Sequence, residues 1–285
     1  ASLMSVSANA GTLDVTGGAS ITFHSDQDTT GNPWSQSSTV VFSGAGDLDN
    51  GWTMNWSYAM SDAAYSSMST SIGMGDGGTL KFGKVAGGVQ AYDNVIPTAK
   101  EESYDDLAGE DNAKSGISTA NAFAYSGSFA GVDVSVGYAK NGSGNASDSS
   151  IGASYTIGDT GLTIGYAAGE DGKTIDETVA YVKYVIGGAT LAYSKHEKNV
   201  SSSATDDEIV QYGGSFAVNE NLSVSYGKTV VDFEDKTSDQ ESTGVSASYT
   251  MGSITIAAAL NDEENTGGTS GSKHSMAEVS VSFAF

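Results

Sequence analysis

Residues 51–60, GWTMNWSYAM, decide the fold class of this chain. Trp and Met, with one Tyr, occupy every second position, and Thr, Asn, Ser and Ala fill the positions between them. A period of two is the pattern of a β-strand whose two faces meet different surroundings. The small polar face suits water, and the large apolar face suits either a second sheet or lipid.

The same alternation extends along nearly the whole chain, up to its last residues, SMAEVSVSFAF at 275–285. An even number of antiparallel strands, most of them about 9–11 residues long, is typical of barrels that cross a bilayer. We predict sixteen strands, over residues 12–24, 36–45, 51–60, 67–74, 78–84, 119–128, 131–139, 150–157, 161–168, 177–186, 188–197, 207–217, 221–231, 241–251, 253–261 and 274–285.

The connections between these strands alternate between short and long. The short ones carry turn residues, such as Gly-Asp-Gly-Gly at 75–78 and Gly-Gly at 187–188. The long ones are predicted at residues 25–35, 61–66, 85–118, 140–149, 169–176, 198–206, 232–240 and 262–273. Sorting by length is expected of an outer-membrane barrel, which has tight turns at one rim and longer loops at the other. The fold class is therefore all-β: a 16-stranded antiparallel transmembrane β-barrel.

A soluble β-sandwich or a β-rich adhesin is the alternative fold. It predicts unsorted loops and strands that are apolar in both phases, and only residues 40–42 and 179–186 have that second property. We treat residues 1–11 as an N-terminal extension of a mature chain, and residues 12–285 as a single barrel domain.

Composition excludes several classes of protein. The 285 residues contain 35 Asp and Glu against 12 Lys and no Arg, which gives a net charge of −23 and excludes binding of nucleic acid through its phosphates. The absence of Cys excludes disulfide scaffolds and zinc–thiolate sites. No apolar run approaches the length of about 18 residues that a membrane-spanning helix needs.

The connection over residues 85–118 is the longest, and a loop of this length inside a compact domain is usually functional. Pro97 and several apolar residues favour an ordered, packed loop. Seven acidic residues in it are opposed by only two lysines, Lys100 and Lys114. A solvated acidic surface loop is the alternative interpretation. The acidic residues are Asp93, Glu101, Glu102, Asp105, Asp106, Glu110 and Asp111.

Three stretches resemble a known family: SQSSTVVFSGAGDLDNGWTMNWSYA at 35–59, GTLKFGKVAGGVQAYD at 78–93, and the terminal strand 275–285 with its final Phe. They are similar to the second and third strands, the fifth strand with its following loop, and the last strand of the alphaproteobacterial general-diffusion porins. The resemblance implies a homotrimer in the outer membrane, in contact with lipid and lipopolysaccharide. It also implies passive diffusion of small hydrophilic solutes, through a lumen that the loop 85–118 narrows to a constriction.

The chain departs from that family on the barrel wall. Ser37 and Thr39 stand where such porins are expected to carry Arg, and Lys81 is the clearest cation in the lumen phase, with Lys183 also placed inward. Carboxylates that greatly outnumber lysines attract cations and repel anions. We therefore predict a cation-selective constriction formed by the seven acidic loop residues with Lys81, Ser37 and Thr39.

Adjacent carboxylates at Glu101, Glu102, Asp105 and Asp106 have the chemistry to hold Ca²⁺, which prefers oxygen ligands. We expect no other cofactor. Three histidines, His24, His196 and His274, lie at the outer ends of predicted strands, but so few give no specific catalytic pattern, and we expect no enzyme. A substrate-specific channel, for which Tyr181 would be a lumen aromatic, and an adhesive surface protein remain the alternative functions.

Overall fold

A computed structural model describes residues 13–26, 31–92, 94–105, 107–109, 121–140, 147–201 and 206–285. It is almost entirely β-structure, with three short 3₁₀ turns, η1 (Gly75–Gly77), η2 (Gly88–Tyr92) and η3 (Thr266–Gly268). The strands are β1 (Leu13–Asp26), β2 (Trp34–Asp47), β3 (Thr53–Ser61), β4 (Ala64–Gly73), β5 (Thr79–Gly83), β6 (Ala122–Phe129), β7 (Val132–Lys140), β8 (Ser147–Thr156), β9 (Leu162–Glu170), β10 (Ile175–Ile186), β11 (Ala189–Val200), β12 (Asp207–Ala217), β13 (Leu222–Phe233), β14 (Gln240–Met251), β15 (Ile254–Glu264) and β16 (Lys273–Ala284).

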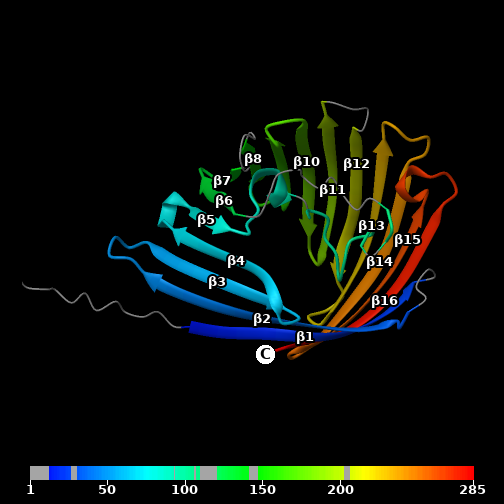
Figure 1. Cartoon of the computed structure of the whole chain (residues 1–285), viewed down its shortest axis with the longest axis horizontal. Helices are drawn as coiled ribbons and strands as arrows, with labels where there is room; N and C mark the ends of the chain where they lie inside the picture. The colour runs from blue at the N-terminus through cyan, green and yellow to red at the C-terminus, as the bar shows by residue number, and fades with distance from the viewer. Residues whose placement is uncertain are drawn as a thin grey trace, which may run out of the picture.

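The sixteen strands form one closed antiparallel barrel in which each strand pairs with its neighbours along the chain (Figure 1). The barrel closes between β1 and β16, where Ile21 faces Val281 and Phe23 faces Val279. At the end of this seam, Gly17 and the C-terminal Phe285 exchange two backbone hydrogen bonds of 2.8 and 2.9 Å. Closure leaves no unpaired sheet edge, which a strand-built structure needs in lipid.

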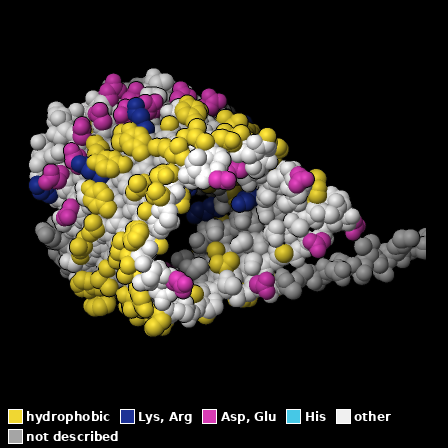
Figure 2. Space-filling view, turned by 180° about the vertical axis from the view of Figure 1, so that it is seen from behind, with side chains coloured by type: hydrophobic (Ala, Val, Ile, Leu, Met, Phe, Trp, Pro, Cys, Tyr) yellow, Lys and Arg dark blue, Asp and Glu magenta, His cyan; other side chains and the backbone are white. Residues whose placement is uncertain are grey.

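The outer face of the barrel is apolar. Large hydrophobic side chains lie exposed on it, including Ile151 at 59% and Leu260 at 55%, and Figure 2 shows such side chains spread over the outer surface. Acidic side chains gather along the upper edge in that view. Among the described residues, no helix is long and apolar enough to cross a membrane. An outside of this kind matches lipid rather than water.

All sixteen predicted strands are present in the predicted order, with ends that shift by a few residues. One connection is corrected: residues 61–66 do not form a long loop, because β3 and β4 are joined by Asp62 and Ala63 alone. Both have positive φ, 50° and 66°, as a tight hairpin turn requires. Residues 1–11 lie outside the described part of the chain.

The apolar stretch 179–186, which fits the alternation poorly, has a structural explanation. Val179 and Tyr181 point into the barrel, yet they are 0% and 9% exposed, because they pack against Val89 and Tyr92 of the connection between β5 and β6. That connection, called the inner loop below (residues 84–121), therefore brings a small apolar core inside the barrel.

Candidate functional site

The described part of the inner loop lies inside the barrel, along the inner wall. Its first part, with η2, lies against β7 to β10: Gly88 N donates to Ser135 Oγ at 3.0 Å, and Ser150 Oγ donates to Gly87 O at 3.0 Å. The rings of Tyr92 and Tyr181 are 5.3 Å apart. In Figure 1 the loop continues within the curve of the sheet toward β13 and β14. The described part of the loop thus narrows the lumen.

Glycines on the inner wall allow this close approach. A Cβ atom at Gly152 of β8 would lie 2.2 Å from the Tyr92 ring. A Cβ atom at Gly244 of β14 would lie 2.8 Å from the Cα atom of Ser103. Such distances are too short for real side-chain atoms, so glycine at these inward positions lets the loop backbone lie against the wall.

The second part of the loop is hydrogen-bonded to β13 and β14 through hydroxyl groups. Ala99 N donates to Ser225 Oγ at 2.9 Å, and Lys100 N donates to Ser246 Oγ at 3.1 Å. The Ser103 hydroxyl lies 3.0 Å from the Thr229 hydroxyl. Small polar residues in the lumen phase, which the sequence shows only as a wettable face, therefore also satisfy the loop backbone.

Asn261 of β15 is the central contact between the loop and the wall. Its Nδ2 group lies 3.0 Å from Glu101 Oε1, 3.3 Å from the Glu102 carbonyl oxygen and 3.1 Å from the Asp105 carbonyl oxygen. Asn261 is only 2% exposed. One buried amide thus fixes three acceptors of the loop.

Lys100 joins the loop to the barrel by charge. Its ammonium is hydrogen-bonded to Glu101 and lies 2.5 Å from Glu278 Oε1 of β16. Burial alone would lower the pKa of Lys100, but the hydrogen bonds to the two carboxylates outweigh it and raise that pKa above its ordinary value. We call Lys100, Glu101 and Glu278 the clasp.

The seven predicted acidic residues fall into three sets. Glu101 is held in the clasp, with a side chain only 10% exposed, so its charge is compensated by Lys100. Glu102 and Asp105 lie in the same segment, and Asp105 Oδ2 accepts a hydrogen bond of 3.1 Å from Glu102 N. The other predicted acidic residues, Asp93, Asp106, Glu110 and Asp111, lie outside the described residues.

The predicted calcium site is only partly described, because Asp106 is one of its four residues. Among the described residues, no three His, Cys, Asp or Glu side chains gather in a way that would hold a metal ion. Calcium binding at Glu101, Glu102, Asp105 and Asp106 stays a prediction.

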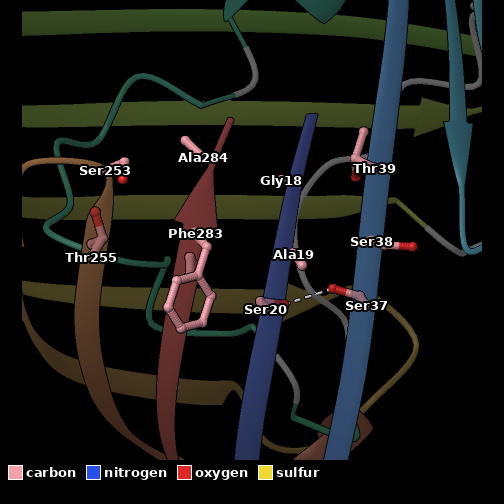
Figure 3. Close-up of a pocket in the computed structure, with 11 residues that line it drawn as sticks. Gly18, Ala19, Ser20, Ser37, Ser38, Thr39, Ser253, Thr255, Phe283 and Ala284 are labelled. Atoms are coloured by element: carbon pink, nitrogen blue, oxygen red, sulfur yellow. Dashed lines mark hydrogen bonds between the residues drawn. The ribbon is translucent and has the colours of Figure 1, made fainter. Parts of the chain in front are cut away.

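Ser37, Thr39 and Lys81 lie in the lumen phase of β2 and β5, as the alternation predicts. Lys81 has no hydrogen bond or ion pair among the described residues. Ser37 Oγ lies 2.7 Å from Ser20 Oγ, and Ser37 and Thr39 line a hollow of about 300 Å³ at the seam between β1, β2, β15 and β16 (Figure 3). This side of the lumen is lined by neutral hydroxyl groups.

The three histidines also lie in the lumen phase. His196 is 0% exposed between Val179 and Ile209 on the neighbouring strands. His274 Nδ1 accepts a hydrogen bond of 3.1 Å from Ala108 N, so it contributes to holding the loop. His24 Nδ1 lies 3.7 Å from Glu278 Oε2, beside the clasp.

The sequence did not identify Lys100, Asn261 and Glu278 as a group. The available signal was that Glu278 is the only acidic residue of the last strand and lies in its lumen phase. Its partners on the loop, however, are far away along the chain, and only the barrel brings them together.

Comparisons with known proteins agree with this architecture. The family described as Gram-negative porin matches residues 1–284. A porin structure refined at 1.8 Å resolution has a TM-score of 0.74 at 17% identity, over 96% of this chain and 100% of that chain. A variant of the Rh. blastica porin with three substitutions has a TM-score of 0.73 at 16% identity, with the same coverage. No curated protein matches the chain.

Proposed function

Because the chain belongs to the Gram-negative porin family and forms a 16-stranded outer-membrane channel, we propose that small hydrophilic solutes and ions diffuse passively through it, with cations favoured. The constriction is the part of the lumen between the inner loop and the wall of β1 to β5. Selectivity arises from its width and its charge, without a strong binding site for solute.

The observation that carries this proposal is the position of the acidic loop segment inside the barrel. Glu102 and Asp105 lie in the segment that Asn261 holds against the wall. The opposite wall offers hydroxyl groups at Ser37 and Thr39 and the ammonium of Lys81, which has no ion pair within the described part of the chain. In a narrow lumen with low-dielectric walls, such an excess of carboxylate raises the local concentration of cations and lowers that of anions.

We also propose a homotrimer embedded in outer-membrane lipid and lipopolysaccharide. This assembly follows the resemblance to the general-diffusion porins. It is supported by aromatic and apolar side chains that cover the outer face of β2 to β5, where Phe42, Trp56, Tyr58 and Tyr65 form a chain of ring contacts. Exposed apolar surface of this extent needs lipid or another subunit to cover it.

Neither alternative function gains support from the described residues. A substrate-specific channel needs aromatic rings exposed along its lumen, whereas Tyr181 is packed against Tyr92 and is 9% exposed. An adhesive surface protein of soluble β-structure would bury its large apolar residues, whereas Ile151 and Leu260 lie on the outer face. We propose no enzymatic activity.

Single-channel recording across a KCl gradient tests the proposal. The purified protein, reconstituted in a planar bilayer, should open to a stable conductance, with a reversal potential of the sign expected for a cation-selective pore. The double variant Glu102→Gln/Asp105→Asn should shift the reversal potential toward zero, and Lys81→Gln should shift it further to the cation side. An anion-selective sign would contradict the charge argument, and absence of conductance would contradict the channel assignment.

A further inference from the structure

The lumen face of β16 contains one residue that does not fit a wet, polar channel. Met276 lies there between His274 and Glu278 and is 4% exposed. Among the other described methionines, four belong to the outward phase of their strands and one lies in a turn: Met54, Met60, Met68 and Met251, and Met74. Met276 is thus the one thioether among the described residues that faces the lumen.

The thioether lies beside an imidazole and a carboxylate. The register of the closing seam pairs His24 of β1 with Glu278 of β16. His24 Nδ1 lies 3.5 Å from Met276 Sδ and 3.7 Å from Glu278 Oε2. The second carboxylate oxygen, Oε1, contacts Lys100 in the clasp. One nitrogen, one sulfur and one oxygen therefore come together where the barrel closes.

These separations suit a small metal ion. With bond lengths like those of zinc, about 2.0 Å to nitrogen, 2.3 Å to sulfur and 2.0–2.2 Å to oxygen, a trigonal site places nitrogen about 3.5–3.6 Å from oxygen and about 3.7 Å from sulfur. The separations of His24 Nδ1 from Met276 Sδ, 3.5 Å, and from Glu278 Oε2, 3.7 Å, lie within about 0.2 Å of these values. The alternative is a weak hydrogen bond from an imidazole N–H to sulfur, which has a similar distance.

The donor types and the local charge narrow the choice of ion. Thioether sulfur is a soft ligand that selects Cu(I) over hard cations, and imidazole also suits copper. Within the clasp, Lys100 contributes one positive charge, and Glu101 and Glu278 contribute two negative charges, so 1 − 2 leaves one negative charge. A monovalent cation would balance it.

We propose that His24, Met276 and Glu278 form a binding site for a soft monovalent cation, Cu(I) or its analogue Ag(I), on the lumen wall at the closing seam. Glu278 contributes Oε2 to the ion and keeps Oε1 on Lys100. Because the site adjoins the clasp that holds the inner loop, an occupied site lies at the edge of the constriction. Binding of the ion does not depend on the proposed function, whereas its effect on current does.

A binding measurement tests the site directly. Purified protein in detergent and chloride-free buffer is titrated with silver nitrate, with His24→Gln and Met276→Leu as site variants and Met251→Leu as the matched control on the outer face. Each site variant should weaken Ag(I) binding by more than about tenfold, since loss of even an outer-shell partner costs 10–100-fold in metal affinity. Met251→Leu should bind as the parent does. Heat-modifiable migration of each variant on a gel establishes that it has folded.

If Met276→Leu and the parent protein bound Ag(I) with equal affinity, the proposed site would be refuted. The contact between His24 and Met276 would then be a hydrogen bond to sulfur. A bilayer recording separates this result from a failure of the channel assignment. Ag(I) should reduce the current through the parent channel and leave that through Met276→Leu unchanged. A parent protein that binds Ag(I) at Met276 but does not conduct would contradict the channel and keep the site.

Discussion

At the scale of single residues, the turn between β9 and β10 depends on one carboxylate that accepts hydrogen bonds from several backbone N–H groups. Asp171, in the connection between β9 and β10, accepts hydrogen bonds on Oδ1 from the amides of Lys173, Thr174 and Ile175, at 2.8, 2.8 and 3.0 Å. Burial alone would raise the pKa of Asp171, but these three bonds outweigh it and lower that pKa below its ordinary value.

Replacement of Asp171 by Ala should loosen this turn. The three amides lose their acceptor at a half-buried site, and we expect a cost of about 1 kcal/mol, as for a lost helix cap. Hydrogen exchange of the amides of residues 173–175 should accelerate about fivefold, while amides within β9 and β10 keep their rates.

The pH dependence of this turn has a definite sign. Because the folded pKa of Asp171 is depressed, its stabilisation is fully present above 3.8, the ordinary value, and is lost as the pH falls through the lower folded value. Protection of these amides should therefore persist at pH 5 and disappear under stronger acid. The same protection in Asp171→Ala would show that the carboxylate does not hold the turn.

Alternation alone could predict the facing of single residues. Lys81, Ser37 and Thr39 face the lumen because a strand turns successive side chains to opposite sides, which is a local rule. The partner of a lumen residue is not a local property. Glu101 adjoins its partner Lys100 in the chain, but nothing near Lys100 in the sequence indicates that Glu278 also lies beside it.

At the scale of whole elements, the described part of the inner loop is attached to the barrel wall at two places. Apolar packing at Val89 and Tyr92 holds its first part, and hydrogen bonds to β13, β14 and β15 hold its second part. Of these, the contacts of Asn261 gather the most loop acceptors in one place. Its replacement therefore tests how firmly the second part is held.

The substitution Asn261→Leu keeps most of the side-chain volume but removes the donor for Glu101, Glu102 and Asp105. At about 0.5–1.5 kcal/mol net for each hydrogen bond, detachment of this segment should become easier by about 2 kcal/mol, or roughly 30-fold. We expect larger current noise and brief closures in single-channel records, with the barrel itself intact.

Asn55→Leu is the matched control, because Asn55 faces the lumen from β3 on the opposite wall. It should leave the noise of the open channel unchanged. If the current noise of Asn261→Leu were as low as that of Asn55→Leu, the hydrogen bonds of Asn261 would not be needed to hold the loop. The packing of Tyr92 on Tyr181 would then hold it alone.

Prediction succeeded for the strands and failed for one turn, for physical reasons. In a strand that is apolar outside and polar inside, apolar and polar residues alternate over about ten positions. One or two residues that break the alternation therefore do not hide the strand. The turn at Asp62 and Ala63 depends on two residues with positive φ and contains no glycine to mark it. The path of the inner loop likewise depends on distant glycines such as Gly244, whose role appears only when Ser103 lies against it.

At the scale of the whole molecule, the barrel separates two surfaces with different chemistry. Its outside is apolar, the net charge of the chain is −23, and the described acidic side chains lie at the rim, in the loops and in the lumen. A charge excess confined to a water-filled passage acts on ions through the solution in that passage. Its effect must therefore depend on the salt concentration.

Cation selectivity should weaken as the salt concentration rises. Fixed charges act over about 30 Å at 0.01 M ionic strength, about 10 Å at 0.1 M and about 3 Å at 1 M. At low salt the carboxylates of the inner loop influence the whole width of the lumen, and at 1 M they influence only ions that touch them. Reversal potentials measured at a constant salt ratio over this range should give a cation-to-anion permeability ratio that falls steadily. In Glu102→Gln/Asp105→Asn the ratio should start lower and change less. A ratio that stayed constant in the parent protein would mean that width alone selects the ions, and that the acidic loop segment does not set the selectivity.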